Sequence, residues 1–428
     1  MGFVKRITIL AALLVVLFFP APALTGSARQ VILMISDGQG FPTVDAAAFF
    51  SGRRPVFESF PVRLAMQTFS ASNDFQANPR GYDPARAGRD KAYILSNATD
   101  SAAAASAMFS GVKVRDGCLN LGDGGKRLET IFEALARGGM AVGVVSSVPW
   151  WHATPGAVAA HCGSRKDYAA IGREMIDCGW LTVIMGTGHL DFDDDGERTW
   201  RLSIPRESRR LWEDIQGGKT PYQRIETKED FEALARDTLP LTRNGRIFGI
   251  PRVFLTLQQA RTRGNPQEVD LGTFNPQVPS VAVMAVGALN VLARNPRGFA
   301  AMIESGGAVD WAAHDNQKGR LVEEQLAHHE AVQAVYDWVR AGDPDFRKTL
   351  LIVASDHDTG NLRVKDRGPG VLPEIAFGNK DHTNGLVPLY AIGAGSELFR
   401  EQVVGRDPVR GDYIDNTSIY RVIRKAVR

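Results

Sequence analysis

Six short runs of apolar and often β-branched residues are spaced along the chain, and the segments between them are long enough to hold helices. Continuous apolar runs of this kind are typical of parallel strands that are covered on both faces of a sheet. The pattern therefore predicts a buried, mostly parallel sheet. Its predicted strands cover residues 31–36, 141–145, 182–185, 300–303, 350–354 and 387–392.

Helical periodicity appears between these runs. Apolar residues recur at the spacing of one helix face from Leu128 to Leu135, and Gly138 follows as a helix stop. Segments 279–292 and 322–339 carry similar patterns. The alternation of strands and helices favours the α/β class, an open sheet whose catalytic groups lie at the carboxyl ends of its strands.

Three segments lack this periodicity and are predicted to be surface connections. Residues 73–91 are polar and rich in Gly, Pro and Arg, residues 191–227 are charged, and residues 264–278 are polar. The acidic run 193–195 suggests calcium, but the rest of an EF-hand loop is missing, so a solvated turn is the better interpretation. We therefore predict one large domain over residues 29–428 with surface insertions.

Composition and charge narrow the class of protein. The chain has 428 residues, of which 44% are hydrophobic and 23% charged, as in an ordinary globular enzyme. These values exclude a disordered chain, a collagen or coiled-coil rod and a protein with many membrane spans. Fifty basic and 48 acidic side chains leave a formal net charge of +2, so the sequence has no electrostatic footprint for nucleic acid.

Residues 1–28 have the pattern of a secretory signal peptide. Lys5 and Arg6 precede an apolar stretch of 13 residues, 7–19, and residues 21–23 form an Ala-x-Ala cleavage motif. An uncleaved anchor is the alternative, but a membrane span needs about 20 apolar residues. We expect cleavage near Ala23 or Ala28, export to the periplasm or the exterior, and no membrane span in the mature chain. Loss of residues 1–23 removes two positive charges, so the mature chain is neutral.

Export to an oxidising compartment permits a disulfide bond. Cys118, Cys162 and Cys178 allow one pair and leave one thiol over, and the sequence does not choose the pair. None of the three lies beside a recognisable activating base. Catalysis by a thiol is therefore not expected.

Acidic side chains and a histidine follow two of the predicted strands. Asp37 comes directly after strand 31–36, and Asp356 and His357 come directly after strand 350–354. An open α/β sheet binds its ligands at this end of its strands. By itself, Asp37 suits a helix N-cap as well as it suits a metal ligand.

A second group of possible metal ligands lies in the C-terminal half of the chain. Asp310 and His314 are four residues apart, which places both side chains on one helix face, and His382 precedes the last predicted strand. A single histidine of this kind is more often structural. Together with the strand-end residues, however, the group supplies enough nitrogen and oxygen ligands for two metal sites, and zinc accepts both ligand types.

One serine is predicted at the start of a helix. Ser101 precedes the alanine-rich segment 102–109, which is a strong helix former, and Gly111 is a natural stop. Free N–H groups and the helix dipole attract anions to such a terminus. A simple N-cap by Asp100 or Ser101 is the alternative for an isolated motif. The possible metal ligands elsewhere in the chain favour a functional role.

These residues make the chain similar to the alkaline phosphatase family, from Val31 to about Ile392 and in the family's order. Segment 99–113 resembles the family's nucleophile signature. The resemblance implies a three-layer αβα sandwich around a mostly parallel central sheet, with two zinc ions and one magnesium ion. It implies that Ser101 accepts the phosphoryl group and faces the second zinc, and that Arg165, held by Asp100, clamps the phosphate. The implied ligands of the first zinc are Asp310, His314 and His382. Those of the second zinc are Asp37, Asp356 and His357, and those of magnesium are Asp37, Thr154 and Glu304.

The sequence departs from the family's pattern around the implied magnesium and phosphate groups. One extra residue separates Glu304 from Asp310, and a β-bulge could absorb it. His152 and Trp311 stand where the best-known enterobacterial enzyme has Asp and Lys. We expect His152 near the magnesium without ligating it, and Trp311 supplies no charge to phosphate.

Two differences in length concern access to the site. Only 25 positions separate His357 from His382, so no large crown domain is expected there. Segment 73–91 instead lengthens the path from Asp37 to Ser101.

The resemblance implies an enzyme that hydrolyses small-molecule phosphate monoesters through a phosphoserine on Ser101. A sulfatase would need a Cys or Ser in a Cys/Ser-x-Pro-x-Arg setting, which residues 101–105 lack. Phosphodiesterases of the superfamily share the zinc ligands but lack the magnesium segment. A catalytically silent, secreted protein that binds metal or phosphate is the third alternative, and it would not need a nucleophile and six competent zinc ligands. A homodimer is compatible with the resemblance, but the sequence does not decide the oligomeric state.

Overall fold

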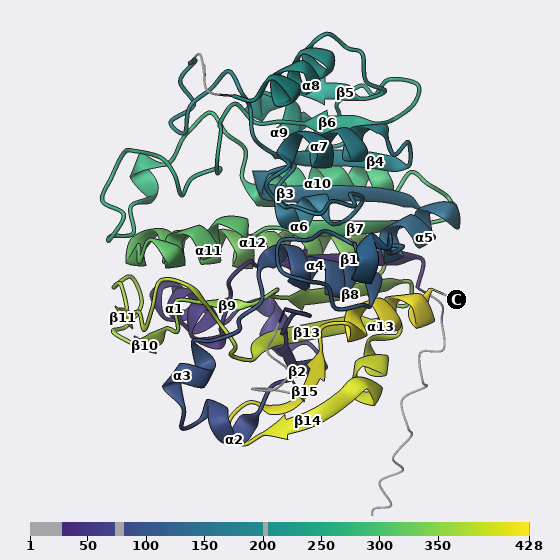
Figure 1. Cartoon of the computed structure of the whole chain (residues 1–428). Helices are drawn as coiled ribbons and strands as arrows, with labels where there is room; N and C mark the ends of the chain where they lie inside the picture. The colour runs from purple at the N-terminus through teal and green to yellow at the C-terminus, as the bar shows by residue number, and fades with distance from the viewer. Residues whose placement is uncertain (1–27, 73–80, 200–203, 428) are drawn as a thin grey trace, which may run out of the picture.

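The computed structural model describes residues 28–72, 81–199 and 204–427. The predicted signal peptide lies outside these residues, apart from Ala28. A large sheet runs through the molecule with the strand order β14-β15-β2-β13-β8-β1-β7-β3-β4-β6-β5, from the yellow β14 to the teal β5 in Figure 1. Its strands are β1 (Gln30–Ile35), β2 (Val62–Gln67), β3 (Ala141–Pro149), β4 (Leu181–Thr187), β5 (Gln223–Ile225), β6 (Ile247–Gly249), β7 (Phe299–Glu304), β8 (Thr349–Ala354), β13 (Val387–Gly393), β14 (Val403–Asp407) and β15 (Gly411–Asp415).

The sheet is mostly parallel, as the apolar runs predict. The central strands β8, β1, β7, β3 and β4 are parallel neighbours. Strand β13 is antiparallel to both of its neighbours, β8 and β2, and β14 is antiparallel to β15. Strand β13 therefore starts at the edge of the sheet where the parallel strands end.

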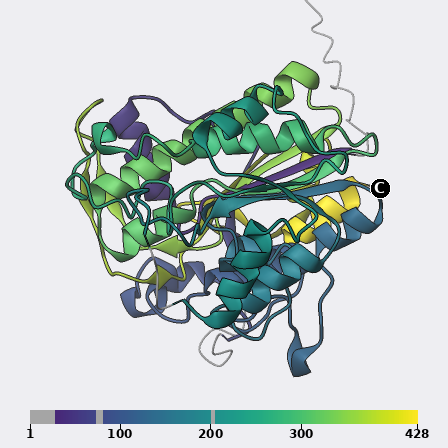
Figure 2. The same cartoon turned by 90° about the horizontal axis from the view of Figure 1, so that it is seen from above.

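The central strands are mostly apolar because both faces of the sheet are covered. Along β1, Leu33 and Ile35 face one hydrophobic core, whereas Ile32 and Met34 face another. Figure 2 shows green helices over one face of the sheet and blue and yellow helices over the other, so the fold is a three-layer αβα sandwich.

The helices of the two outer layers come from different parts of the chain. On one side lie α1 (Phe41–Ser51), α9 (Lys228–Ala235), α10 (Val281–Leu292) and α12 (Lys318–Gly342), and on the other lie α4 (Ser101–Ser110), α5 (Ile131–Arg137), α6 (Ala153–Gly156), α7 (Tyr168–Asp177), α8 (Arg206–Gln216) and α13 (Ser418–Ala426). Helix α11 (Gly307–His314) follows β7 directly. No helix in the described part of the chain is both long and apolar enough to cross a membrane.

Segments that were predicted to be surface connections contain more structure than expected. Helix α8 and strand β5 lie within residues 191–227. The charges around α8 outweigh its apolar positions in the sequence, but Leu211, Trp212 and Ile215 are buried against the core. In segment 73–91, residues 73–80 lie outside the described residues, and α2 (Pro84–Ala87) and the start of α3 (Lys91–Ile94) follow.

Two further expectations are corrected by local hydrogen bonds. Helix α5 begins at Ile131 rather than at Leu128, because the Thr130 side chain and Glu133 form a capping box. The acidic run 193–195 does form a turn, but its carboxylates are not simply solvated. Asp194 Oδ1 accepts a bond of 2.7 Å from the amide of Leu255, and Asp195 Oδ1 accepts one of 2.9 Å from the amide of Thr262. The run therefore ties down residues 255–262.

No large crown domain lies between His357 and His382 in the described part of the chain, as predicted. The interval between His357 and His382 holds the short strands β9 (Asp358–Thr359), β10 (Arg363–Lys365) and β11 (Glu374–Ala376), and His382 itself begins β12 (His382–Thr383). Strands β9 and β12 pair with each other. All three cysteines are free thiols in the structure.

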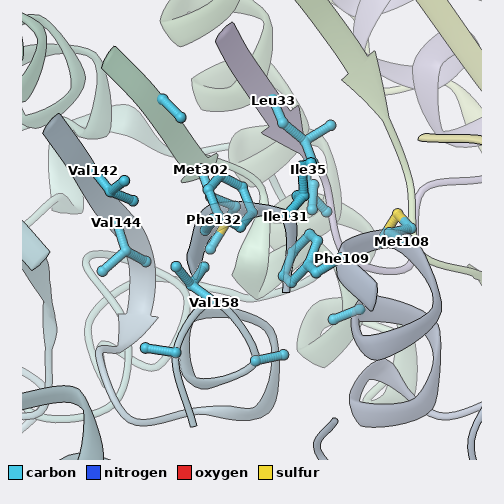
Figure 3. Packing of buried hydrophobic residues seen from close by; sticks show 14 of the residues in the cluster. Leu33, Ile35, Met108, Phe109, Ile131, Phe132, Val142, Val144, Val158 and Met302 are labelled. Carbon is cyan, nitrogen blue, oxygen red and sulfur yellow. The ribbon is translucent and has the colours of Figure 1, made fainter. Parts of the chain in front are cut away.

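Helix α4 is held against the sheet by large apolar side chains at its C-terminal end. Figure 3 shows Phe109 directed toward Ile131 and Phe132 of α5. The rings of Phe109 and Phe132 meet edge to face, with centroids 5.2 Å apart, and both are fully buried. This packing fixes the position of Ser101 at the other end of α4.

We expect Phe109→Ala to lower the free energy of unfolding by about 3–5 kcal/mol, because it removes a buried ring and leaves a cavity. Val112→Ala is the matched control, since Val112 lies nearby but is 44% exposed, and it should change stability by less than about 0.5 kcal/mol. Urea unfolding followed by circular dichroism measures both. Equal effects of the two substitutions would contradict the assigned packing.

Candidate active site

The candidate site lies where four neighbouring central strands end. Strands β8, β1, β7 and β3 stand side by side, and Ile35 at the end of β1 is aligned with Ala354 of β8 and with Glu304 of β7. Asp37 and Asp356 therefore extend from neighbouring strands at the same level. Gly38 has a φ of 75°, and a Cβ there would lie 2.9 Å from the Cα of Asp310, so glycine lets β1 approach α11 closely.

The first group of donors is Asp310, His314 and His382. On α11, His314 Nε2 lies 3.3 Å from Asp310 Oδ2, as the spacing of four residues predicts. His382 arrives from β12, and its Nε2 lies 3.1 Å from His314 Nε2 and 3.5 Å from Asp310 Oδ1.

The orientation of these two histidines is set by main-chain carbonyls. His314 Nδ1 donates to the carbonyl of Lys380 at 2.6 Å, and His382 Nδ1 donates to the carbonyl of Thr99 at 2.7 Å. A carbonyl only accepts, so the Nδ1 proton is fixed and the Nε2 lone pair of each neutral ring faces the group. Thr359 Oγ1 donates to Asp310 Oδ1 at 2.6 Å and orients that carboxylate.

The second group surrounds His357 Nε2. Three oxygens lie near this nitrogen: Ser101 Oγ at 3.2 Å, Asp37 Oδ1 at 3.3 Å and Asp356 Oδ2 at 3.4 Å. All four residues are buried. Both carboxylate oxygens of Asp37, and Oδ2 of Asp356, lack a hydrogen-bond partner among the described residues. Buried carboxylate oxygens rarely stay unpaired, so a missing cation is the natural partner.

Both groups have the geometry that zinc requires. A tetrahedral zinc with ligands at 2.0–2.2 Å separates neighbouring donor atoms by roughly 3.3 Å. The donor separations of 3.1–3.5 Å in the first group, and the distances of 3.2–3.4 Å from His357 Nε2 to the three oxygens of the second, agree with this value. The residues present therefore fit a zinc ion in each group.

Burial and mutual repulsion perturb the carboxylates. Burial raises the pKa of Asp37 well above its usual range, and the charges of Asp356 and Asp310 add to this effect. Burial, with the charge of Asp310, raises the pKa of Asp356 to about 7. Burial alone would also raise the pKa of Asp310, but its histidine partners His314 and His382 hold it well below its usual range. The site thus gathers buried carboxylates that need either a proton or a bound cation to balance their charge.

A third group lies on the side of β3. Oxygens of Asp37 and Glu304 and a ring nitrogen of His152 lie within 4.8 Å of one another. Thr154 follows on α6, and its hydroxyl is buried without a hydrogen-bond partner among the described residues. Burial raises the pKa of Glu304 to about 8, although Ser146 Oγ on β3 donates to its carboxylate.

The extra residue before Asp310 does not form a bulge. Strand β7 keeps a regular register with β1 and β3 up to Glu304. The additional residue lies instead in the turn Ser305–Gly306 between β7 and α11, where Ser305 Oγ is 2.8 Å from His328 Nδ1. Glu304 and Asp310 therefore both point to the site.

Ser101 and Arg165 meet at the N-terminal end of α4, beside the donor groups. Ser101 is the first residue of α4, and Asp100 caps the helix by accepting from the amide of Ala103 at 2.9 Å. The other oxygen of Asp100 accepts from Arg165 Nη1 at 2.9 Å. Burial would lower the pKa of Arg165, but this ion pair raises it. The fork of Arg165 is thereby held beside the N-terminal end of α4.

His152 and Trp311 lie beside this arginine. His152 Nε2 is 3.2 Å from Arg165 Nη2, and the His152 and Trp311 rings meet edge to face with centroids 5.6 Å apart. Burial and the charge of Arg165 lower the pKa of His152 to about 3, so the imidazole is neutral. Trp311 brings no charge to Arg165 and His152, because an indole ring is uncharged.

The sequence profile of the alkaline phosphatase family matches residues 28–418 of the chain. The chain belongs to the alkaline phosphatase family. It is 26% identical to alkaline phosphatase 4 of Bacillus subtilis (strain 168) over 347 residues, which cover 79% of this chain and 63% of that protein. It is 25% identical to the alkaline phosphatase of Escherichia coli (strain K12) over 423 residues, which cover 86% of this chain and 81% of that protein.

Solved structures of the alkaline phosphatase family share the fold. The alkaline phosphatase of the Antarctic bacterium TAB5 superposes with a TM-score of 0.67 at 21% identity, covering 94% of this chain and 98% of that one. The Thermus thermophilus alkaline phosphatase gives a TM-score of 0.68 at 20% identity, covering 95% and 93%. The matched region spans less than two thirds of two Bacillus subtilis relatives, 63% and 62%.

Several supporting residues of this alkaline phosphatase site were not found from the sequence. Ser146 and Thr359 hold Glu304 and Asp310 through side-chain hydrogen bonds. Thr359 gives a weak signal, because it follows His357 by two residues. Ser146 gives none, since it lies inside an apolar strand.

Several histidine and lysine side chains outside the three donor groups have structural surroundings. His161 lies 2.8 Å from the Leu128 carbonyl, and the Lys113 ammonium lies 3.0 Å from Asp415. His328 and His329 are buried on α12. None of them joins the three donor groups.

Proposed function

We propose that this protein is an exported, metal-dependent phosphatase that hydrolyses phosphate monoesters with Ser101 as the nucleophile and a phosphoserine as the intermediate. The observation that carries the proposal is the position of Ser101 Oγ. It stands at the N-terminus of a buried helix and 3.2 Å from His357 Nε2, within a group of metal donors. Membership of the alkaline phosphatase family supports the same chemistry.

The donor sets support three divalent ions. Asp310, His314 and His382 would hold the first zinc, Asp37, Asp356 and His357 the second zinc, and Asp37, Thr154 and Glu304 a magnesium. When bound, such ions supply positive charge that lowers the pKa of a nearby hydroxyl or water and balances charge on a transferring phosphoryl group. A structure of a TAB5 enzyme variant has magnesium in its M3 site. A ring nitrogen of His152 lies within 4.8 Å of oxygens of Asp37 and Glu304, and we propose that it stays beside the magnesium without ligating it.

The chain's own residues perform two displacements at phosphorus. In the first, a bond forms between Ser101 Oγ and phosphorus while the ester P–O bond breaks, and the alcohol leaves with a proton. In the second, water attacks the same phosphorus, the Oγ–P bond breaks, and inorganic phosphate leaves. Splitting one displacement into two lets the same side chain serve as nucleophile and leaving group.

Arg165 and α4 bind the phosphoryl oxygens throughout. Asp100 accepts from Nη1 of Arg165, so the guanidinium is oriented before substrate arrives. A planar fork can donate two parallel bonds to two non-bridging oxygens. The positive end of the α4 dipole lies at the same place. These groups recognise a dianion, which a monoester is and a diester is not.

The proposed recognition predicts that Arg165→Lys lowers kcat/KM for an aryl phosphate monoester by about 10- to 100-fold, because lysine cannot donate in parallel. Hydrolysis of the matching diester should change much less. Arg173→Lys is the control, since Arg173 also pairs with an aspartate, Asp214 at 3.0 Å, but far from the donor groups. Steady-state kinetics with both esters measures the effect.

The same measurements separate the alternatives. A wild-type enzyme that prefers the diester would support a phosphodiesterase of the superfamily. A wild-type protein that binds metal and hydrolyses neither ester would support a silent binding protein. We also propose export, on the basis of the signal pattern in residues 1–28, and mass spectrometry of the mature N-terminus tests it. An intact N-terminus in the purified protein would contradict export by cleavage.

A further inference from the structure

An apolar cavity adjoins the candidate active site on the side of His152 and Trp311. Its volume is about 190 Å³, and both of these residues line it. Trp150, Leu211 and Trp212 form buried parts of its wall. The described residues that line it include no Asp, Glu, Lys or Arg, and His152, the one histidine among them, is neutral.

The cavity begins beside the groups that would bind phosphate. His152 lies 3.2 Å from the Arg165 fork on one side and contacts the Trp311 ring on the other. An organic group attached to a phosphate at Arg165 therefore reaches the cavity by passing these two rings. The proposed catalysis uses none of the deeper wall.

We propose that this cavity is the subsite for the organic group of the substrate, and that the enzyme prefers phosphate monoesters of apolar, aromatic-sized alcohols. The inference rests on the proposed function and adds a substrate class to it. An apolar protein cavity of about 150 Å³ holds a benzene molecule. A cavity of about 190 Å³ that is open toward the site is therefore large enough for a ring and part of a second one.

The wall chemistry favours an apolar occupant. Transfer of a ring from water to an aromatic wall is favourable, and aromatic pairs add to the gain. A sugar or glycerol moiety would lose its water in the same place and find few partners, which costs free energy for each unpaired hydroxyl. Trp150 Nε1 and His152 Nδ1 are the buried polar atoms of the wall that have no hydrogen-bond partner among the described residues. Isolated polar groups in an apolar wall are typical of small-molecule sites.

A second cavity on the other side of Trp311 offers the polar alternative. It is lined by His314, Asp315 and Gln317 among others, and by Arg261 and Arg320. Both arginines contact the single buried carboxylate of Glu323, at 2.8 and 3.1 Å, which balances one of their two charges, and Asp194 and Asp315 also line this cavity. A polar alcohol in this cavity would exchange water for similar contacts and gain little.

The experiment compares phenyl phosphate with 2-naphthyl phosphate on the metal-loaded enzyme. Phenol and 2-naphthol have similar acidity, so a difference in kcat/KM reports binding of the organic group rather than leaving-group reactivity. We expect kcat/KM to be at least about tenfold higher for the naphthyl ester, mainly through a lower KM. Glycerol 2-phosphate should be the poorest of the three substrates.

Ser208→Phe fills the cavity without removing an existing ring, because Ser208 on α8 lines it with a small side chain. The naphthyl advantage should disappear in this variant, while methyl phosphate hydrolysis stays within about twofold of wild type. Ser208→Ala is the matched control and should keep the advantage. The wild-type comparison stands alone if the larger variant does not fold.

The outcomes distinguish the two proposals. Equal kcat/KM for phenyl and naphthyl esters, or a preference for glycerol 2-phosphate, would overturn the subsite while leaving the phosphatase activity in place. A naphthyl advantage that survives in a folded Ser208→Phe enzyme would overturn it too. Failure to hydrolyse any of the esters would overturn the proposed function instead, and quenching of tryptophan fluorescence by 2-naphthyl phosphate would then test the cavity alone.

Discussion

Ser101→Ala is expected to reduce kcat for an aryl phosphate by about four orders of magnitude or more, because it removes the atom that attacks phosphorus. The loss should appear in kcat and in kcat/KM together, since the Oγ–P bond exists only after substrate has bound. Substrate binding should persist, because Arg165 and the N-terminus of α4 are unchanged. The fold should persist as well, since the side chain lost is one hydroxyl whose nearest polar neighbour is His357 Nε2 at 3.2 Å.

Ser110→Ala is the matched control for this variant. Ser110 ends the same helix, and its hydroxyl donates to the Ser106 carbonyl at 2.7 Å, away from the donor groups. The control should retain nearly full activity. Acid quenching of wild-type enzyme during turnover of a ³²P-labelled monoester should trap label on the protein, and Ser101→Ala should trap none. Residual turnover within tenfold of wild type would show that water attacks the ester directly.

The fold class and the donor groups could be predicted from the sequence for a specific physical reason. Parallel strands buried on both faces are continuous apolar runs, so their ends are visible, and Asp37 and Asp356 follow two of those ends. Asp310 and His314 share a helix face because a helix repeats every 3.6 residues. The local pattern placed these side chains, whereas their assignment to metal groups came from the family resemblance.

The parts that could not be predicted depend on contacts between distant segments. Helix α8 has a highly charged sequence, and only the tertiary core shows why Leu211 and Trp212 face inward. The Thr99 carbonyl that orients His382 is 283 positions away in the chain. The aromatic cavity beside Trp311 gathers side chains from several loops and helices, none of which has a recognisable motif. Contacts between distant segments leave no periodic pattern in the sequence.

The extra residue between Glu304 and Asp310 illustrates the same limit. A bulge and a longer turn are equally consistent with one inserted residue in the sequence. The structure has the longer turn, because both neighbours of β7 keep their register to Glu304.

Removal of the metal ions is expected to abolish phosphatase activity and to destabilise the protein. A strong chelator should lower turnover to background, and zinc with magnesium should restore it. Calcium should not restore it, because it prefers six to eight oxygen ligands and the donor groups supply three histidine nitrogens to the two zinc sites. Without cations, burial raises the pKa values of the Asp37, Glu304 and Asp356 carboxyl groups, and repulsion from neighbouring carboxylates adds to this effect. The melting temperature should therefore fall on chelation.

The pH dependence of the metal-free protein gives this prediction a sign. Burial raises the pKa of Glu304 from an ordinary 4.5 to about 8, so the folded state keeps a proton that the unfolded state has already lost. Burial would lower the pKa of His382, but hydrogen bonding to Asp310 and the charge of that carboxylate raise it from 6.5 to about 9, and the folded state again holds more protons. Stability must then fall as pH rises from 7 to 9, by on the order of 1 to 3 kcal/mol.

Metal ions should remove this pH dependence between pH 7 and 9. Bound cations take the place of the protons on Glu304 and His382, so neither group titrates in the folded, metal-loaded protein over that range. Buried, neutral histidines such as His357 have their pKa lowered by burial, and their opposite contribution is complete before pH 7. Urea unfolding at pH 7, 8 and 9, with and without chelator, measures both curves. Parallel curves would show that these side chains do not converge on cations, and would remove the physical basis for the metal sites.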